Sequence, residues 1–138
     1  MNNLEWSKEM SVGSDELDHQ HQTLFSLYNN LLVVLSNGVA NKVFGLSDGV
    51  LQGLVEYVNI HFNYEENLIE KAGYPDLASH KAQHEIYIRK ILEAQVGLNK
   101  DSDIAEWDSL CQFLSDWLVG HVMGTDRLYA PYLRAVTR

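Results

Sequence analysis

The sequence predicts an all-α protein: an antiparallel up-down-up-down four-helix bundle with an irregular N-terminal arm and a short C-terminal helix. Apolar residues recur at intervals of three and four along four long stretches, which is the period of a helix that buries one face. Turn signals such as Ser36-Asn37-Gly38 and Gly73-Tyr74-Pro75 leave short connections, and these force successive helices to run antiparallel. A chain of 138 residues suits one domain, so we expect a single domain over residues 1–138.

The arm and the first helix come from the first 38 residues. The first dozen residues, including Trp6, are expected to be irregular, and Gly13-Ser14-Asp15 provides turn and cap chemistry. A helix is predicted from about Asp18 to the stop at Ser36-Asn37-Gly38. Its buried face would consist of Leu24, Phe25, Tyr28, Leu31, Leu32 and Leu35.

The other helices follow the same periodicity. The second is predicted to begin between Asn41 and Ser47 and to end at Gly73-Tyr74-Pro75. The third would be capped by Asp76 and would end around Gly97 to Lys100. The fourth would start near Asp101 to Asp103 and run to His121, and a short final segment would span about Thr125 to Leu133.

Composition excludes several classes of function. The formal net charge of −9 argues against binding to nucleic acid or to an anionic membrane surface. The longest apolar run, Leu31 to Leu35, is far below the roughly 18 residues of a membrane span, and the N-terminus lacks the order of a secretory signal. The single cysteine, Cys111, is expected to be a small core residue in a reducing compartment, so we expect a cytoplasmic protein.

Five of the six histidines fall on the apolar stripes of the predicted helices. His61 and Glu65 are four residues apart, which places them about 40° apart around the second helix. His80 and His84 repeat this spacing on the third helix, while His21 and His121 lie on the stripes of the first and fourth. Polar side chains would therefore converge from all four helices at one level of the core.

Such a convergence predicts a metal site, because buried imidazoles and carboxylates are costly unless they are paired or bound to metal. Imidazole with a minority of carboxylate suits iron, zinc, copper or nickel, and seven donors are too many for one tetrahedral zinc. Two metals bridged by carboxylates and one oxo or hydroxo group would use these donors and leave about one position open. Mostly neutral imidazole donors favour reversible dioxygen binding over oxygenase chemistry. The predicted ligands are His21, His61, Glu65, His80, His84, His121 and Asp126.

One spacing does not fit a regular helix. His121 and Asp126 are five residues apart, a rotation of about 140° on an α-helix, so they cannot share one face. We therefore predict that the helix ends, tightens or carries a π-type bulge between them, eased by Gly120 and Gly124.

Taken together, these motifs resemble the hemerythrin family, and bacterial hemerythrin-like domains in particular. The resemblance runs from about Trp6 to Tyr132. It is carried by Trp6, Val12-Gly13, Asp18 and Gln20-His21, by His61-Phe62-Asn63-Tyr64-Glu65-Glu66, by Gly73-Tyr74-Pro75 with His80-Lys81-Ala82-Gln83-His84, and by Trp117-Leu118-Val119-Gly120-His121 through Asp126.

The resemblance implies two iron ions and a role for each matched residue. His80, His84 and His121 would bind one iron, and His21 and His61 the other, which would be the dioxygen site. Glu65 and Asp126 would bridge the two irons. Leu24 and Leu118, each one helical turn from a ligand histidine, would line the dioxygen pocket.

Several alternatives stay open at this point. The same site could be an oxygen-sensing or redox-sensing input domain with a fused or partner signalling domain, and a di-iron enzyme acting on peroxide or nitric oxide ranks lower; we expect no enzyme. A metal-free bundle would leave five buried histidines without an explanation. His19 is expected to be solvated or a cap-region residue, Glu66 to be solvated or capping, and Tyr129 and Tyr64 are candidate hydrogen-bond donors to a ligand.

Overall fold

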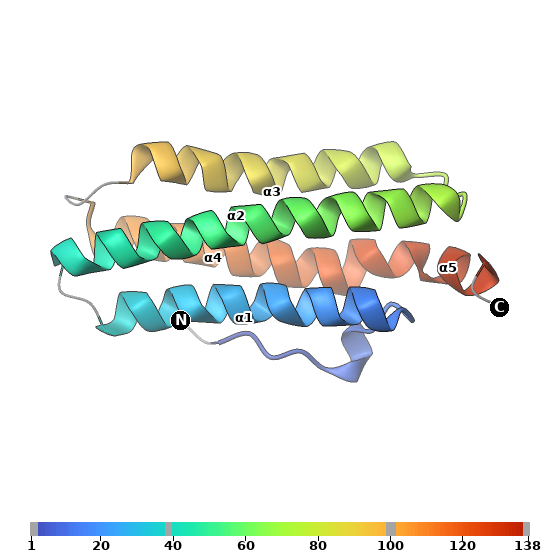
Figure 1. The fold of residues 1–138 in the computed structure, drawn as a ribbon, viewed down its shortest axis with the longest axis horizontal. Coiled ribbons are helices and arrows are strands. Elements are labelled where there is room, and N and C mark those ends of the chain that lie inside the picture. The colour runs from blue at the N-terminus through green and yellow to red at the C-terminus, as the bar shows by residue number, and fades with distance from the viewer. Residues whose placement is uncertain (1–2, 38–39, 99–101, 137–138) are drawn as a thin grey trace.

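Four long helices lie side by side in the computed structural model, which describes residues 3–37, 40–98 and 102–136. They are α1 (Asp15–Asn37), α2 (Ala40–Lys71), α3 (Leu77–Gly97) and α4 (Ile104–Gly120). Each runs antiparallel to the next (Figure 1), and α1 and α3 each pack against both α2 and α4. The described ranges contain no strand. The prediction of an up-down-up-down four-helix bundle is confirmed.

The N-terminal arm lies along α1 and is fixed to it by hydrogen bonds. It contains one short turn, η1 (Lys8–Met10), and is otherwise irregular, as expected. The side chain of Asn29 bonds both the N–H and the carbonyl of Leu4, at 2.8 and 2.9 Å. Asp18 accepts hydrogen bonds from the Ser11 hydroxyl at 2.5 Å and from the Val12 N–H at 2.9 Å. Asp18 lies in the first turn of α1, three residues before His21, and therefore fixes the arm to the start of this helix.

Helix boundaries differ from the predictions by a few residues. α1 begins at Asp15 rather than Asp18, and the Ser14 hydroxyl accepts from the Leu17 N–H at 3.3 Å. α2 begins at Ala40, before the predicted range, while the predicted stop at Gly38 lies outside the described residues. α4 begins at Ile104, directly after the predicted start near Asp101 to Asp103, and Asp103 caps it in a capping box with Glu106.

The chain departs from α-helical geometry where the sequence predicts it. α4 continues into a π-helical turn, η2 (His121–Thr125), then η3 (Asp126–Tyr129) and α5 (Ala130–Val136). The Asp126 N–H donates to the His121 carbonyl, five residues earlier. The wide turn brings Asp126 round to the side of the helix that carries His121, and both residues are buried.

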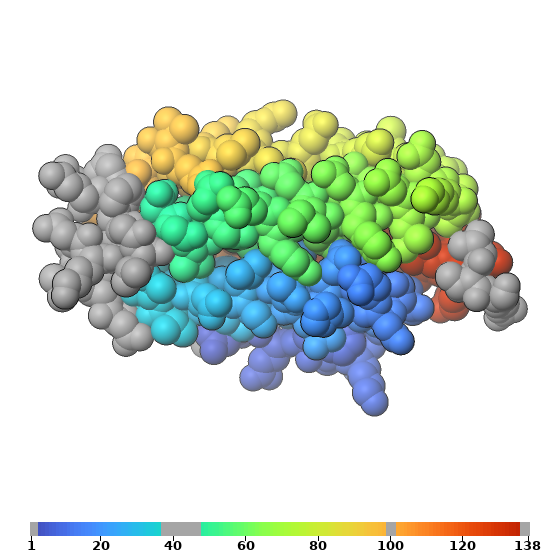
Figure 2. Space-filling model, in the orientation of Figure 1, coloured from blue at the N-terminus to red at the C-terminus, as the bar shows by residue number. Residues whose placement is uncertain are grey.

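The core has two apolar parts. The larger includes Leu24, Leu118 and the buried Cys111, and the smaller packs Val12, Leu17, Ile69, Tyr74, Tyr129, Ala130 and Leu133 near the end that carries α5. The buried histidines, Glu65 and Asp126 lie where these two parts meet. On the face seen in Figure 2, side chains of α1, α2 and α3 cover this interior. None of the helices in the described ranges has the length and apolar content needed to cross a membrane.

Candidate metal centre

The seven predicted ligands all meet in the core. Each is at most 4% exposed, and both carboxylates are fully buried. Their donor atoms form two groups, within each of which the atoms lie within 4.8 Å of one another: Glu65, His80, His84, His121 and Asp126 in one, and His21, His61 and Glu65 in the other. We call His80, His84 and His121 the three-histidine group and His21 and His61 the two-histidine group.

Glu65 divides the histidines between its two oxygens. Its Oε1 lies 2.6 Å from Nε2 of His80 and 3.0 Å from Nε2 of His84. Its Oε2 lies 3.4 Å from Nε2 of both His21 and His61. One oxygen therefore faces the three-histidine group and the other faces the two-histidine group.

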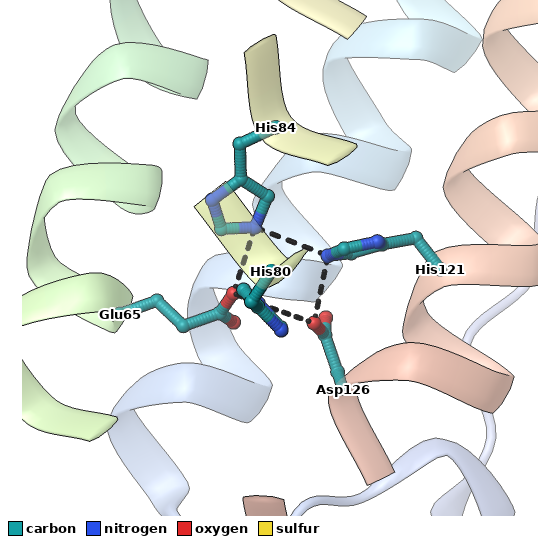
Figure 3. A group of neighbouring side chains, drawn as sticks. All are labelled: Glu65, His80, His84, His121 and Asp126. Atoms are coloured by element: carbon teal, nitrogen blue, oxygen red, sulfur yellow. Dashed lines mark hydrogen bonds and ion pairs between the residues drawn. The ribbon is translucent and has the colours of Figure 1, made fainter. Parts of the chain in front are cut away.

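Asp126 repeats this division. Its Oδ1 lies 3.2 Å from Nε2 of His80 and 2.9 Å from Nε2 of His121, while its Oδ2 lies 3.1 Å from Nε2 of His21. Figure 3 shows the two carboxylates facing the three-histidine group from α2 and from the turn after α4. Two buried carboxylates thus separate the five imidazoles into the same two sets.

Three of the predicted ligand histidines bond a second acceptor through the outer ring nitrogen, Nδ1. Amide and carboxylate oxygens only accept, so these Nδ1 atoms carry a proton, and in the neutral imidazole the inward Nε2 then has the lone pair that a metal needs. Each supporting residue adjoins a predicted ligand on its own helix and reaches a histidine of the next helix. The pairs are Gln20 Oε1 with His61 at 2.6 Å, Glu66 Oε2 with His84 at 2.7 Å, and Gln83 Oε1 with His121 at 3.2 Å.

A cation between these atoms fits the donor set. The Nε2 atoms of His84 and His121 lie only 3.1 Å apart, and two neutral rings with Nδ1 protonated would turn two lone pairs toward each other. Both oxygens of Asp126 and both ring nitrogens of His21 are buried without a hydrogen-bond partner, as is Nδ1 of His80. Such groups are costly in a dry core unless they coordinate metal. The residues present therefore suit a pair of metal ions.

Protons stabilise part of the cluster when metal is absent. Burial alone lowers the pKa of His21 and His80, but the close carboxylates of Asp126 and Glu65 outweigh it and raise the pKa to about 10 for His21 and about 9 for His80. These two histidines are the ones whose Nδ1 has no acceptor, so a proton on Nε2 faces the carboxylates. Burial opposes ionisation of Glu65, yet its histidine neighbours hold its pKa well below the usual range. Burial lowers the pKa of His121.

Aromatic rings fix two of the imidazoles. Phe62 stacks on His84 with ring centroids 3.7 Å apart and planes 2° apart. Trp117 stacks on His121 with ring centroids 4.3 Å apart and planes 11° apart. Tyr87 stacks in turn on Trp117, with ring centroids 4.3 Å apart. Planar contacts on both rings restrict their rotation, so the inward direction of Nε2 is set before any ion binds.

The sequence-based expectations for nearby residues have mixed outcomes. Tyr129 donates to Glu65 Oε2 at 2.8 Å, as predicted. Tyr64 is 41% exposed and has no hydrogen bond to a predicted ligand among the described residues. The expectation that Glu66 is solvated or capping is wrong, because α2 turns its carboxylate toward α3 and it bonds His84. His19 is exposed, as expected.

Two supporting residues escaped the sequence analysis. Gln20 appeared there only as part of a motif, and Gln83 only as a neighbour of His84. Gln83 also accepts from the Thr125 hydroxyl at 2.9 Å, which ties α3 to the π-helical turn. Their position beside a ligand was the available signal. Leu24 and Leu118 are each 1% exposed and belong to the same apolar cluster.

Comparison with known proteins agrees with this geometry. The family profile of the Hemerythrin HHE cation binding domain matches residues 12–133. The chain therefore belongs to the hemerythrin family, whose profile is described as cation binding.

Individual relatives cover most of the chain. It is 35% identical over 132 residues to a bacteriohemerythrin of Stenotrophomonas maltophilia, covering 96% of this chain and 82% of that protein. It is 36% identical over 124 residues to a hemerythrin-like protein of Naegleria gruberi, covering 90% and 88%. A crystal structure of wild-type hemerythrin superposes with a TM-score of 0.78 at 30% identity, covering 94% of this chain and 97% of that one. An L114A mutant of hemerythrin gives a TM-score of 0.79 at 29% identity, covering 96% and 98%.

Proposed function

We propose that this protein binds dioxygen reversibly at a pair of iron ions in the core of the bundle. The three-histidine group would hold one iron and the two-histidine group the other, while Glu65 and Asp126 would bridge them. The proposed ligands are His21, His61, Glu65, His80, His84, His121 and Asp126.

The observation that carries the proposal is the shared division of the histidines by both carboxylates. Glu65 and Asp126 each direct one oxygen to the three-histidine group and the other to the two-histidine group. A carboxylate in that arrangement suits two ions better than one. The smaller group offers one imidazole fewer, so a vacant position for a diatomic ligand would lie there.

The two ions would supply the binding and reversible reduction of dioxygen, and the chain would control access and polarity. Leu24 and Leu118 are buried apolar side chains of the larger apolar cluster, which would keep water from the site. The stacked rings of Phe62 and Trp117 hold His84 and His121 in place. Tyr129 holds Glu65 by a hydrogen bond at Oε2.

Related proteins carry names that agree with this proposal. Those cited above are named bacteriohemerythrin, hemerythrin-like protein and hemerythrin. We further propose that the protein binds dioxygen without turning it over, and that residues 1–138 form one domain. We also propose that it works in the cytoplasm, where the buried free thiol of Cys111 would persist.

An optical spectrum combined with an iron count tests the proposal. The iron-loaded chain would be measured after reduction, after exposure to air and after removal of the air. We expect about two irons per chain, a visible absorption that forms in air, and its loss on deoxygenation. One iron per chain, or steady consumption of dioxygen with no stable oxygenated form, would contradict the proposal.

A further inference from the structure

Only one of the three outer acceptors on the ligand histidines is charged. His84 donates its Nδ1 proton to the carboxylate of Glu66 at 2.7 Å, whereas His61 and His121 donate to the amide oxygens of Gln20 and Gln83. The charged contact belongs to the three-histidine group. The two proposed metal positions therefore differ in their surroundings as well as in their number of histidines.

A carboxylate and an amide act differently on a metal-bound imidazole. A negative acceptor draws the Nδ1 proton more strongly, which increases the electron density that Nε2 gives to the metal. An amide oxygen orients the ring with less effect on its donor strength. Donor strength matters most for the oxidised ion, since a higher positive charge gains more from an electron-rich ligand.

α2 is built to hold His84 from two sides. Phe62 stacks flat on the imidazole at 3.7 Å, and Glu66, one turn later on the same helix, accepts its proton. Glu65, adjacent to Glu66, places Oε1 3.0 Å from Nε2 of the same ring. The consecutive glutamates thus contact opposite nitrogens of one imidazole, and only Glu66 retains some exposure, 18% of its side chain.

We propose that Glu66 is a positioning residue that acts through His84 to make the three-histidine position the more electron-donating of the two metal positions. Glu66 thereby lowers the reduction potential of the metal pair and helps to retain the ion at the three-histidine position. The proposal rests on the proposed di-iron function. It assigns to Glu66 no contact with dioxygen and no bond to metal.

The test compares three variants of the full iron-loaded chain. Glu66→Gln keeps the shape and the acceptor oxygen but removes the charge. Glu70→Gln removes the same charge one turn further along α2, at an exposed position. Gln83→Glu places a charge on His121 instead, and its carboxylate can accept from both present partners, His121 and Thr125.

Two readouts separate tuning from structural damage: the reduction potential by spectroelectrochemical titration, and iron release to excess chelator. Glu66→Gln should raise the potential and speed release of one of the two irons about tenfold. Glu70→Gln should match the unaltered chain in both. Gln83→Glu should lower the potential, a change of opposite sign that a merely disturbed site would not produce.

The proposal is overturned if Glu66→Gln and Glu70→Gln have the same potential, or if Glu66→Gln and Gln83→Glu shift it in the same direction. Failure of the underlying function looks different. In that case the unaltered chain would not hold two irons or would not form a reversible oxygenated species, whatever the variants do.

Discussion

The hydroxyl of Tyr129 donates a 2.8 Å hydrogen bond to Oε2 of Glu65, the oxygen that faces the two-histidine group. Tyr129 is fully buried and follows the π-helical turn, so a residue near the C-terminus fixes a carboxylate of α2. The other oxygen of Glu65 is held by His80 at 2.6 Å. Both oxygens are thus oriented by the chain itself.

Replacing Tyr129 by phenylalanine should destabilise the iron-free protein. A buried hydrogen bond to a carboxylate contributes about 1.5–3 kcal/mol, and its loss leaves Oε2 with one partner fewer. Urea denaturation measures the change in the free energy of unfolding. Tyr132→Phe, at a ring that is 37% exposed, is the matched control. Equal stability of the two variants would show that the bond to Glu65 contributes nothing.

Replacing Glu65 by alanine should reduce iron binding from about two ions per chain to at most one. The substitution removes one of the two proposed bridging ligands, a carboxylate that lies in both donor groups, and leaves the imidazoles around it without that carboxylate. Elemental analysis of the purified protein gives the count. Glu70→Ala, on the exposed side of the same helix, should bind as the unaltered chain does. Full iron content in Glu65→Ala would refute the bridging role.

Replacing Leu118 by alanine should speed oxidation of the oxygenated protein in air and lower its stability. Truncating a leucine that is 1% exposed leaves a cavity, costs about 2–5 kcal/mol, and admits water or anions toward the site. The decay of the oxygenated spectrum measures the oxidation rate. Leu128→Ala, at a side chain that is 62% exposed, controls for the same truncation. An unchanged rate would remove Leu118 from the lining of the pocket.

Metal removal should cost several kcal/mol of stability, and this cost should grow with pH. Without metal, His21 and His80 have pKa values of about 10 and 9, above the unfolded value near 6.5. A raised pKa stabilises the fold below about pH 6.5, and this contribution is lost as the pH rises through 9 to 10. His121, whose pKa burial lowers, has its unfavourable effect only below pH 6.5.

Urea denaturation at about pH 6.5, 8 and 9.5 checks this expectation. The iron-free protein should lose stability over this range, whereas the iron-loaded protein should not, because metal requires deprotonated imidazoles. His19→Gln, at an exposed histidine, should keep the slope of the unaltered chain. A flat pH profile for the iron-free protein would contradict the ionisation assigned to His21 and His80.

The sequence predicts the bundle and the convergence of the site because both depend on helical periodicity. Five histidines on four apolar stripes leave few arrangements other than a shared level in the core. The break between His121 and Asp126 is also predictable, since a spacing of five cannot place two side chains on one α-helical face. The start of α1 is harder to predict, because Asp15 and Asp18 are both acceptable first-turn residues. The hydrogen bond from the Leu17 N–H to the Ser14 hydroxyl decides between them.

The supporting contacts could not be predicted, because each links side chains on two different helices. Glu66 resembles a solvated glutamate in the sequence, and only the relative rotation of α2 and α3 brings it to His84. Gln20 and Gln83 raise the same difficulty, as their partners lie 41 and 38 residues away along the chain. Periodicity gives the inward face of one helix but not which neighbour a flanking side chain touches.

The wide turn at His121–Thr125 has a consequence for chain length. Rewinding it into a regular helix of the same length would rotate everything that follows by about 100°, carrying Asp126 and Tyr129 away from the centre together. Removing one residue at the same time would offset this rotation, because a spacing of four on a regular helix again places a histidine and an aspartate about 40° apart. We therefore expect homologous chains to keep the wide turn together with the five-residue spacing.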